Sequence, residues 1–355
     1  MFGMGMYKKA RKYGYAATRA KAMESKLIDS ATMRSIADAK DVDSILSILF
    51  QTDYSAAIAK FGGLGINPIM LDFAVSENMA ERVSKLAEIT PHEDQHVIRK
   101  IIARWDLANI KMVLEAVDRK QPYEAISQYI INSGGIKPVL LRDAAKADNV
   151  QEAIQRMMRS KTYRKTLSAA LEAYKKTRNV MDASAWIDMQ HYRELGELAV
   201  KLGRAKDASA VLIMMDIDMR NMITMLRAKK KGLRYNDISK TIMPNGTVTP
   251  NSLASVYNST EDVVSLALKS KAFDMKVPAD IYRVNGQLLS FEIGMRNQIF
   301  NESSRLLKSA VLTLGALVDY VYMKEIEVFT LRALIKSKEY GLSREDVSRL
   351  VAWTL

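Results

Sequence analysis

Two stretches of the chain repeat each other without a gap. Residues 218–233 read DMRNMITMLRAKKKGL, and residues 327–342 read EVFTLRALIKSKEYGL. Each combines a polar start, an apolar run, a basic end and a closing Gly-Leu, and the second follows the first at an offset of 109 residues (327 − 218). An offset of this size is the length of a whole domain. The repeat therefore indicates duplicated domains instead of the short units of a solenoid.

A third, shorter copy of this stretch lies earlier in the chain. It reads WDLANIKMVL over residues 105–114, and its Asp106 precedes Asp218 by 112 residues. Aromatic landmarks keep a similar period, since Tyr54, Tyr163 and Phe273 follow one another at offsets of 109 and 110. Three copies at nearly equal spacing predict three similar domains in a row.

Loops rich in Gly and Asn place the domain boundaries near residues 125 and 237. We therefore expect helical repeat domains over residues 1–125, 126–237 and 238–355, the first of them with a basic N-terminal segment. Three quasi-equivalent domains can close into a ring or funnel with pseudo-threefold symmetry. A linear array is the alternative that the sequence leaves open.

The repeated stretch has the pattern of a helix. Asp106 and Asn109 are three residues apart and share one helix face, which apolar residues continue. Gly232 and Gly341 stand where a left-handed C-cap needs glycine. We expect the polar positions to hold the core and to hydrogen-bond helix ends or loops of their own domain. The residues of this repeat motif are Trp105, Asp106, Asn109, Asp218, Asn221, Gly232, Glu327, Arg332 and Gly341.

The composition predicts an all-α protein. Apolar residues recur at spacings of three and four, with no convincing alternation at two, and only 7 of 355 residues are Pro. The chain has no Cys, so disulfides, thiolate metal sites and cysteine nucleophiles are excluded. No apolar stretch is long enough to span a bilayer, and no apolar leader region follows the basic start.

The net charge of +13 favours a negatively charged partner, which could be nucleic acid, anionic lipid or an acidic protein. Two basic runs stand out as surfaces that a partner could contact, although a solvated helix end is the simpler interpretation of the second. Their residues are Lys8, Lys9, Arg11 and Lys12 in the first run and Lys229, Lys230 and Lys231 in the second.

The chain resembles the family of C subunits of V-type and archaeal A-type ATP synthases, the equivalent of the d subunit of eukaryotic V-ATPases. The opening YGYAATRAKAMESKL of residues 13–27, the segment of residues 39–54 and the three motif copies all follow the pattern of that family. The similarity extends over about residues 13–353. Two features depart from the family. Thr330 stands where Asn is usual, and residues 1–12 form an extra basic segment.

The resemblance implies three helical domains in a funnel and a non-catalytic role in the rotor, as part of the central stalk. Such a protein sits peripherally on the cytoplasmic face of the membrane, as a single copy within a hetero-oligomeric complex. It couples the proteolipid ring to the central shaft of D and F subunits, in ATP synthesis or hydrolysis linked to protons or sodium ions. We expect no catalytic residue, cofactor or metal in such a protein. The sequence contains no P-loop and no recognition-helix or RNP pattern, so we also expect no nucleotide site of its own and no nucleic-acid partner.

One motif points to a different chemistry. Residues 92–96 read HEDQH, the H-E-x-x-H signature of zinc proteases, in which two His one turn apart hold the metal. The plainer interpretation makes Thr90 a helix N-cap and Pro91 the first helical residue, with Glu93 in the exposed first turn. A zinc hydrolase and a basic helical scaffold that binds nucleic acid or another acidic partner are the competing functions.

Overall fold

The computed structural model describes residues 2–127, 129–131, 135–204, 207–258, 276–307 and 311–342. Every regular element in these ranges is helical, which confirms the predicted all-α class. The chain divides into two compact units. The terminal unit comprises Met1–Met79, Ile89–Pro91 and Gly196–Leu355, and the middle unit comprises Ala80–Glu88 and His92–Leu195. The division into three domains of about 110 residues stays a prediction.

The terminal unit contains both ends of the chain. Its α-helices and two short 3-10 helices are α1 (Phe2–Glu24), α2 (Ser30–Asp38), α3 (Val42–Leu49), α4 (Ser55–Lys60), η1 (Gly63–Gly65), α12 (Ser209–Lys230), α13 (Tyr235–Ile238), η2 (Ser239–Thr241), α14 (Pro250–Asn258), α16 (Lys276–Asn285), α17 (Leu288–Leu307) and α18 (Leu314–Glu339). The helices of the middle unit are α6 (Gln95–Asp118), α7 (Tyr123–Ser127), α8 (Pro138–Ala145), α9 (Val150–Met157) and α10 (Arg164–Thr177). Both units share α5 (Pro68–Ile89) and α11 (Val180–Arg204).

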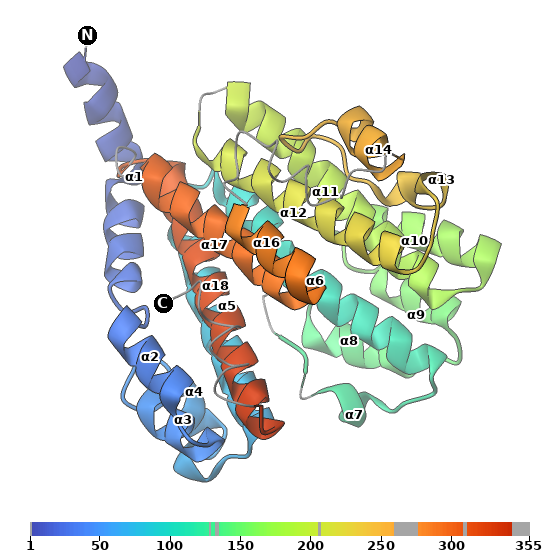
Figure 1. Ribbon diagram of the computed structural model, residues 1–355, viewed down its shortest axis with the longest axis horizontal. Helices are drawn as coiled ribbons and strands as arrows, with labels where there is room; N and C mark the ends of the chain where they lie inside the picture. The colour runs from blue at the N-terminus through green and yellow to red at the C-terminus, as the bar shows by residue number, and fades with distance from the viewer. Residues whose placement is uncertain are drawn as a thin grey trace. The chain divides into compact units, whose positions relative to one another are not determined.

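Helix α18 forms the core of the terminal unit. All of residues 314–322 are buried, so this part of the helix has no solvent face, as expected of a core helix. Helices α1, α3, α12 and α17 pack against it, and α1 and α18 run side by side in Figure 1. The first and last helices of the described chain are therefore packed directly on each other.

The middle unit has an apolar core of its own. Helix α6 packs on α7, α8 and α9, and α9 in turn contacts α10. The core side chains follow the helical spacing of these sequences, for example Ile110, Val113 and Leu114, which are fully buried. A core of this kind stabilises the unit through removal of apolar surface from water.

The three motif copies lie on α6, α12 and α18, and these helices end alike. Gly232 and Gly341 have positive φ angles of 67° and 65°, and Lys120 takes the same conformation at 54° in the first copy. In each case the next residue donates its N–H to a carbonyl five positions back, as Leu342 does to Ser337 at 2.9 Å. These are Schellman caps, in which glycine avoids the steric cost of a left-handed backbone.

Candidate functional site

The motif residues build three polar nodes, one on each motif helix. In the middle unit the Asn109 amide forms a reciprocal pair with the backbone of Ile131, donating at 2.6 Å and accepting at 3.0 Å. The Tyr163 hydroxyl donates to Asp106 Oδ2 at 2.5 Å. Burial and the neighbouring Asp106 charge raise the pKa of Tyr163, so it remains a donor. The node joins α6 to the loop that follows α7 and to the start of α10.

The node on α12 repeats this geometry. Asn221 donates to the Met243 carbonyl at 2.9 Å and accepts the Met243 N–H at 2.8 Å. Asp218 accepts the N–H groups of Thr247 at 2.8 Å and Val248 at 3.2 Å, as well as the Thr247 hydroxyl. Burial raises the pKa of Asp218 to about 6, although these hydrogen bonds act in the opposite direction.

Glycine permits the close approach of each loop to its carboxylate. A Cβ atom built on Gly135 would lie 2.0 Å from Asp106 Oδ2, and one on Gly246 would lie 2.0 Å from Asp218 Oδ1. No side chain fits at such a distance, so both loops need glycine at this position.

The node on α18 is built differently. Glu327 accepts hydrogen bonds from Tyr54 Oη at 2.6 Å, from the Ile28 N–H at 2.5 Å and from Lys324 Nζ at 2.7 Å. Lys324 Nζ also donates to Tyr54 Oη at 2.9 Å. Thr330 stands at the Asn position, but its hydroxyl donates to the Ile326 carbonyl within its own helix at 2.9 Å.

The partners of the motif residues are loops, as predicted, but not those of the predicted domain. Ile131 and Met243 each follow their Asn by 22 residues and lie beyond the boundaries expected near 125 and 237. For α18 the partners come from the N-terminal segment, at Ile28 and Tyr54. Each motif residue nevertheless belongs to the same compact unit as its partners, and the predicted domain boundaries themselves stay a prediction.

Two other residues of the predicted repeat motif, Trp105 and Arg332, have roles in packing and ion pairing. Trp105 is buried on α6, and Arg332 forms a two-point ion pair with the buried Asp72 of α5 at 2.8 and 3.0 Å. Lys324 was missed by sequence reasoning. A single cation within the apolar run of residues 314–331 is the signal that could have found it, because a buried charge needs a partner. Phe273 lies outside the described residues.

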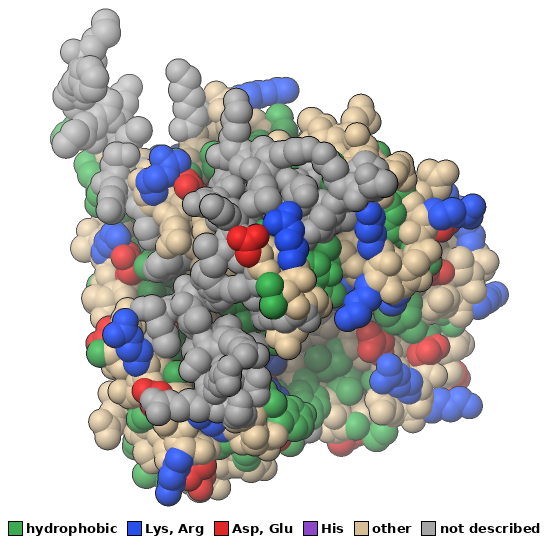
Figure 2. Space-filling view, viewed as in Figure 1, with side chains coloured by type: hydrophobic (Ala, Val, Ile, Leu, Met, Phe, Trp, Pro, Cys, Tyr) green, Lys and Arg blue, Asp and Glu red, His purple; other side chains and the backbone are tan. Residues whose placement is uncertain are grey.

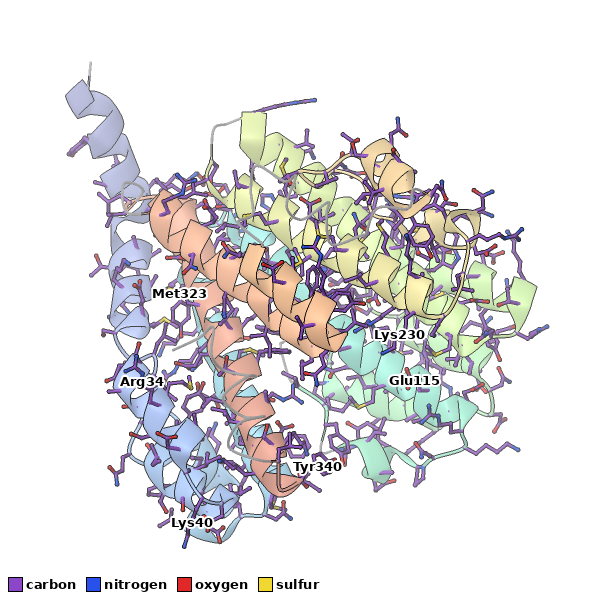
Figure 3. All side chains as sticks on the ribbon, viewed as in Figure 1. Arg34, Lys40, Glu115, Lys230, Met323 and Tyr340 are labelled. Atoms are coloured by element: carbon purple, nitrogen blue, oxygen red, sulfur yellow. The ribbon has the colours of Figure 1, made fainter. Side chains whose placement is uncertain are left out.

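The predicted basic residues lie at two helix termini of the terminal unit. Lys229, Lys230 and Lys231 are all exposed at the end of α12, and Lys229 Nζ lies over the Tyr257 ring at 5.4 Å from its centroid. Figure 3 labels Lys230 at this helix end. Arg11 and Lys12 are exposed on α1, and Lys8 and Lys9 belong to the same helix. Figure 2 shows Lys and Arg side chains spread over the visible face among Asp and Glu.

The zinc motif does not have the helical geometry that its chemistry needs. Helix α6 begins at Gln95, so His92 and His96 do not lie on successive turns of one helix, and His96 Nδ1 contacts the Glu93 carbonyl at 2.7 Å. The predicted helix start at Thr90 and Pro91 was also wrong, because α5 continues to Ile89 and a turn follows. Among the described residues, no group of three His, Asp or Glu is placed to hold a metal ion.

Within the described ranges, no helix combines the length and the apolar character needed to cross a membrane. The nodes bring together carboxylates, amides and hydroxyls, but each group is used in fastening one segment of the chain to another.

Known proteins of one family are similar to this sequence over nearly its whole length. The sequence model of a family described as "ATP synthase (C/AC39) subunit" matches residues 16–350. A protein named as the C subunit of the A-type ATP synthase of Thermoplasma acidophilum is 27% identical over 331 residues, which cover 90% of this chain and 91% of that protein. Proteins of the same name from Methanocaldococcus jannaschii and Desulfurococcus sp. are 23% and 24% identical, over 96% and 95% of this chain and 86% and 90% of their own lengths.

Proposed function

Because this chain belongs to the ATP synthase (C/AC39) subunit family, we propose that it is a non-catalytic component of the central stalk. In this role it is the socket between the proteolipid ring of the membrane sector and the shaft of D and F subunits. Rotation of the ring, driven by protons or sodium ions, passes through it to the catalytic head, and the reverse occurs during ATP hydrolysis. It holds no nucleotide site of its own.

The observation that carries this proposal is the node around Glu327. A part that transmits torque must not shear, and apolar packing alone has no direction and resists sliding poorly. Hydrogen bonds to charged groups have defined geometry and contribute about 1.5–3 kcal/mol each. Tyr54 and Ile28 both donate to one buried carboxylate on α18, and Lys324 of the same helix donates to Tyr54, so the N-terminal segment is fastened to α18.

The net positive charge of the chain is consistent with a position between acidic surfaces. We assign the exposed cations of the two basic runs to the partner-facing surface, either toward the shaft or toward lipid headgroups. Each Lys or Arg near an anionic leaflet contributes about 1 kcal/mol to membrane association. The protein is thus a peripheral component on the cytoplasmic face, present as one copy in a hetero-oligomeric complex.

Affinity purification of the tagged chain from gently solubilised native membranes tests the proposal. We expect mass spectrometry to find ring proteolipid, the D and F subunits, and the catalytic A and B subunits in the same preparation. Membranes carrying the untagged chain serve as the control. A preparation that lacks these proteins, from membranes that contain the intact ATPase, would remove the assigned function.

The competing function is a basic scaffold for nucleic acid, and the same preparation distinguishes it. Such a scaffold would be recovered with nucleic acid, and its binding to random DNA would weaken steeply as salt increases.

A further inference from the structure

The middle unit contains a cavity that the coupling role does not use. Its volume is about 320 Å³, and both polar and apolar groups line it. The wall includes the first turns of α6, the start of α10 and the loop at Gly135. Among its lining residues are two cations, two hydroxyls and two carboxylates: Arg99, Lys100, Thr162, Thr166, Asp106 and Glu194.

Two helix N-termini lie at the wall of this cavity. Helix α10 begins after Tyr163 with no side-chain cap, so the N–H groups of its first turn are left for another acceptor. Helix α6 likewise begins without a side-chain cap and contributes Arg99 and Lys100 from its first two turns. Helix N-termini together with basic side chains favour anions.

One hydroxyl that lines the cavity has no partner in the part of the chain that the structure describes. The Thr166 side chain is only 6% exposed, yet it makes no hydrogen bond within the described residues. Its oxygen is not among the described polar atoms that are sealed from solvent, so water reaches it through the cavity and an anion can take the place of that water. Thr162, on the rim of the same helix start, offers a second hydroxyl.

The acidic groups in the wall are already engaged. Lys100 Nζ forms a close ion pair with Glu194, and Gln190 also donates to this carboxylate at 2.9 Å. Burial raises the pKa of Glu194, but the bonds from Lys100 and Gln190 outweigh it and lower the pKa overall. Asp106 accepts the Tyr163 hydroxyl. Arg99 is exposed on the rim and has no ion-pair partner within the described residues, which leaves its charge for a ligand.

We propose that this cavity binds a tetrahedral oxyanion, a phosphate group held by the Arg99 guanidinium, the Thr166 hydroxyl and the free N–H groups at the start of α10. Arginine binds phosphate oxygens through paired N–H donors, and the uncapped helix start supplies further donors in a fixed direction. The phosphate is either free in solution or carried as a monoester by a small molecule.

Isothermal titration calorimetry of the purified full-length chain tests this site. The probes are inorganic phosphate and glycerol 1-phosphate, each titrated at constant ionic strength with chloride as the background anion. We expect saturable binding with one site per chain. Tighter binding of inorganic phosphate would identify the free ion as the ligand, and tighter binding of the ester would identify a phosphate monoester.

Two substitutions with matched controls locate the binding. Arg99→Gln removes the charged donors that the phosphate oxygens would accept from, and is expected to weaken binding at least about tenfold. Thr166→Val removes the hydroxyl at nearly constant volume and is expected to weaken binding as well. Arg119→Gln at the far end of α6 and Thr177→Val in the last turn of α10 leave the affinity unchanged.

The proposal fails if neither probe produces saturable heat, or if Arg99→Gln and Arg119→Gln change the affinity equally. The second result would show that phosphate responds only to the general positive charge of the chain.

Discussion

Tyr54 and Glu327 lie 273 residues apart in the sequence and are joined by a hydrogen bond of 2.6 Å between Tyr54 Oη and Glu327 Oε1. In the middle unit the equivalent bond joins Tyr163 to Asp106, only 57 residues apart. The N-terminal segment therefore does for α18 what the following segment does for α6.

The α18 node is expected to make a large contribution to stability. Glu327→Gln removes the carboxylate that forms an ion pair with Lys324, whose side chain is 1% exposed. Removing one member of a buried ion pair costs about 3–5 kcal/mol, whereas Tyr54→Phe removes one neutral donor and costs about 1–3 kcal/mol. Urea unfolding should show this order. Glu339→Gln, in an exposed pair on the same helix, is the control, and an equal loss for all three variants would contradict the assignment.

The reciprocal amide pair on α12 predicts a second loss. Asn221→Leu leaves both the N–H and the C=O of Met243 without partners in a buried site, and we expect a destabilisation of about 1–3 kcal/mol. Asn236→Leu changes an exposed position on α13 and should leave the midpoint of urea unfolding where it is. The account of the pair is wrong if both variants unfold at the wild-type midpoint.

Substitution of two glycines by alanine is expected to change the stability in opposite directions, because only Gly246 lies close to a carboxylate. Gly246→Ala places a methyl group against Asp218 and displaces its hydrogen bonds, so we expect a loss of about 2–4 kcal/mol. Gly14→Ala lies within α1, where a Cβ atom meets nothing within 4 Å, and should stabilise by about 0.5–1 kcal/mol. Thermal unfolding of the two variants measures the sign of each change in stability. A Gly246→Ala variant that unfolds at the wild-type temperature would show that the loop can move away from Asp218.

The contact of α1 with α18 is expected to depend on pH. Burial raises the pKa of Asp319 to about 7, and the Glu24 charge on α1 adds to the rise. Because the carboxyl holds its proton more tightly in the folded chain, the free energy of unfolding falls as the pH rises from about 4 to about 7. Asp319→Asn removes this titration and should stabilise the protein by about 2–4 kcal/mol at pH 8, with little effect at pH 4.

Urea midpoints measured between pH 4 and pH 8 test the titration of Asp319. The exposed Asp148→Asn variant should keep the pH profile of the unsubstituted protein. An Asp319→Asn profile parallel to the wild type would assign the pH dependence to other groups.

Local features were readable from the sequence. Apolar spacing predicted the helices, and the Gly-Leu endings predicted the left-handed caps at Gly232 and Gly341, because these structures depend on residues within one or two turns. The pairing of Glu327 with Tyr54 had no local signal, since the two residues meet only in the folded chain. The helix start predicted at Thr90 shows that a local signal can also mislead, because no helix begins there. Its capping pattern was plausible, but α5 continues to Ile89, α6 begins only at Gln95, and Thr90 is buried between the two helices in the sequence.

Coupling of the ring to the shaft by this chain is tested most directly by ion transport in membranes depleted of it. Sealed vesicles that carry the ATPase are stripped of the chain, and ATP hydrolysis and ATP-driven ion uptake are then measured with and without purified chain added back. We predict that hydrolysis persists in the stripped vesicles while ion uptake is lost, and that the added chain restores uptake. Full ion uptake without the chain would contradict the coupling role.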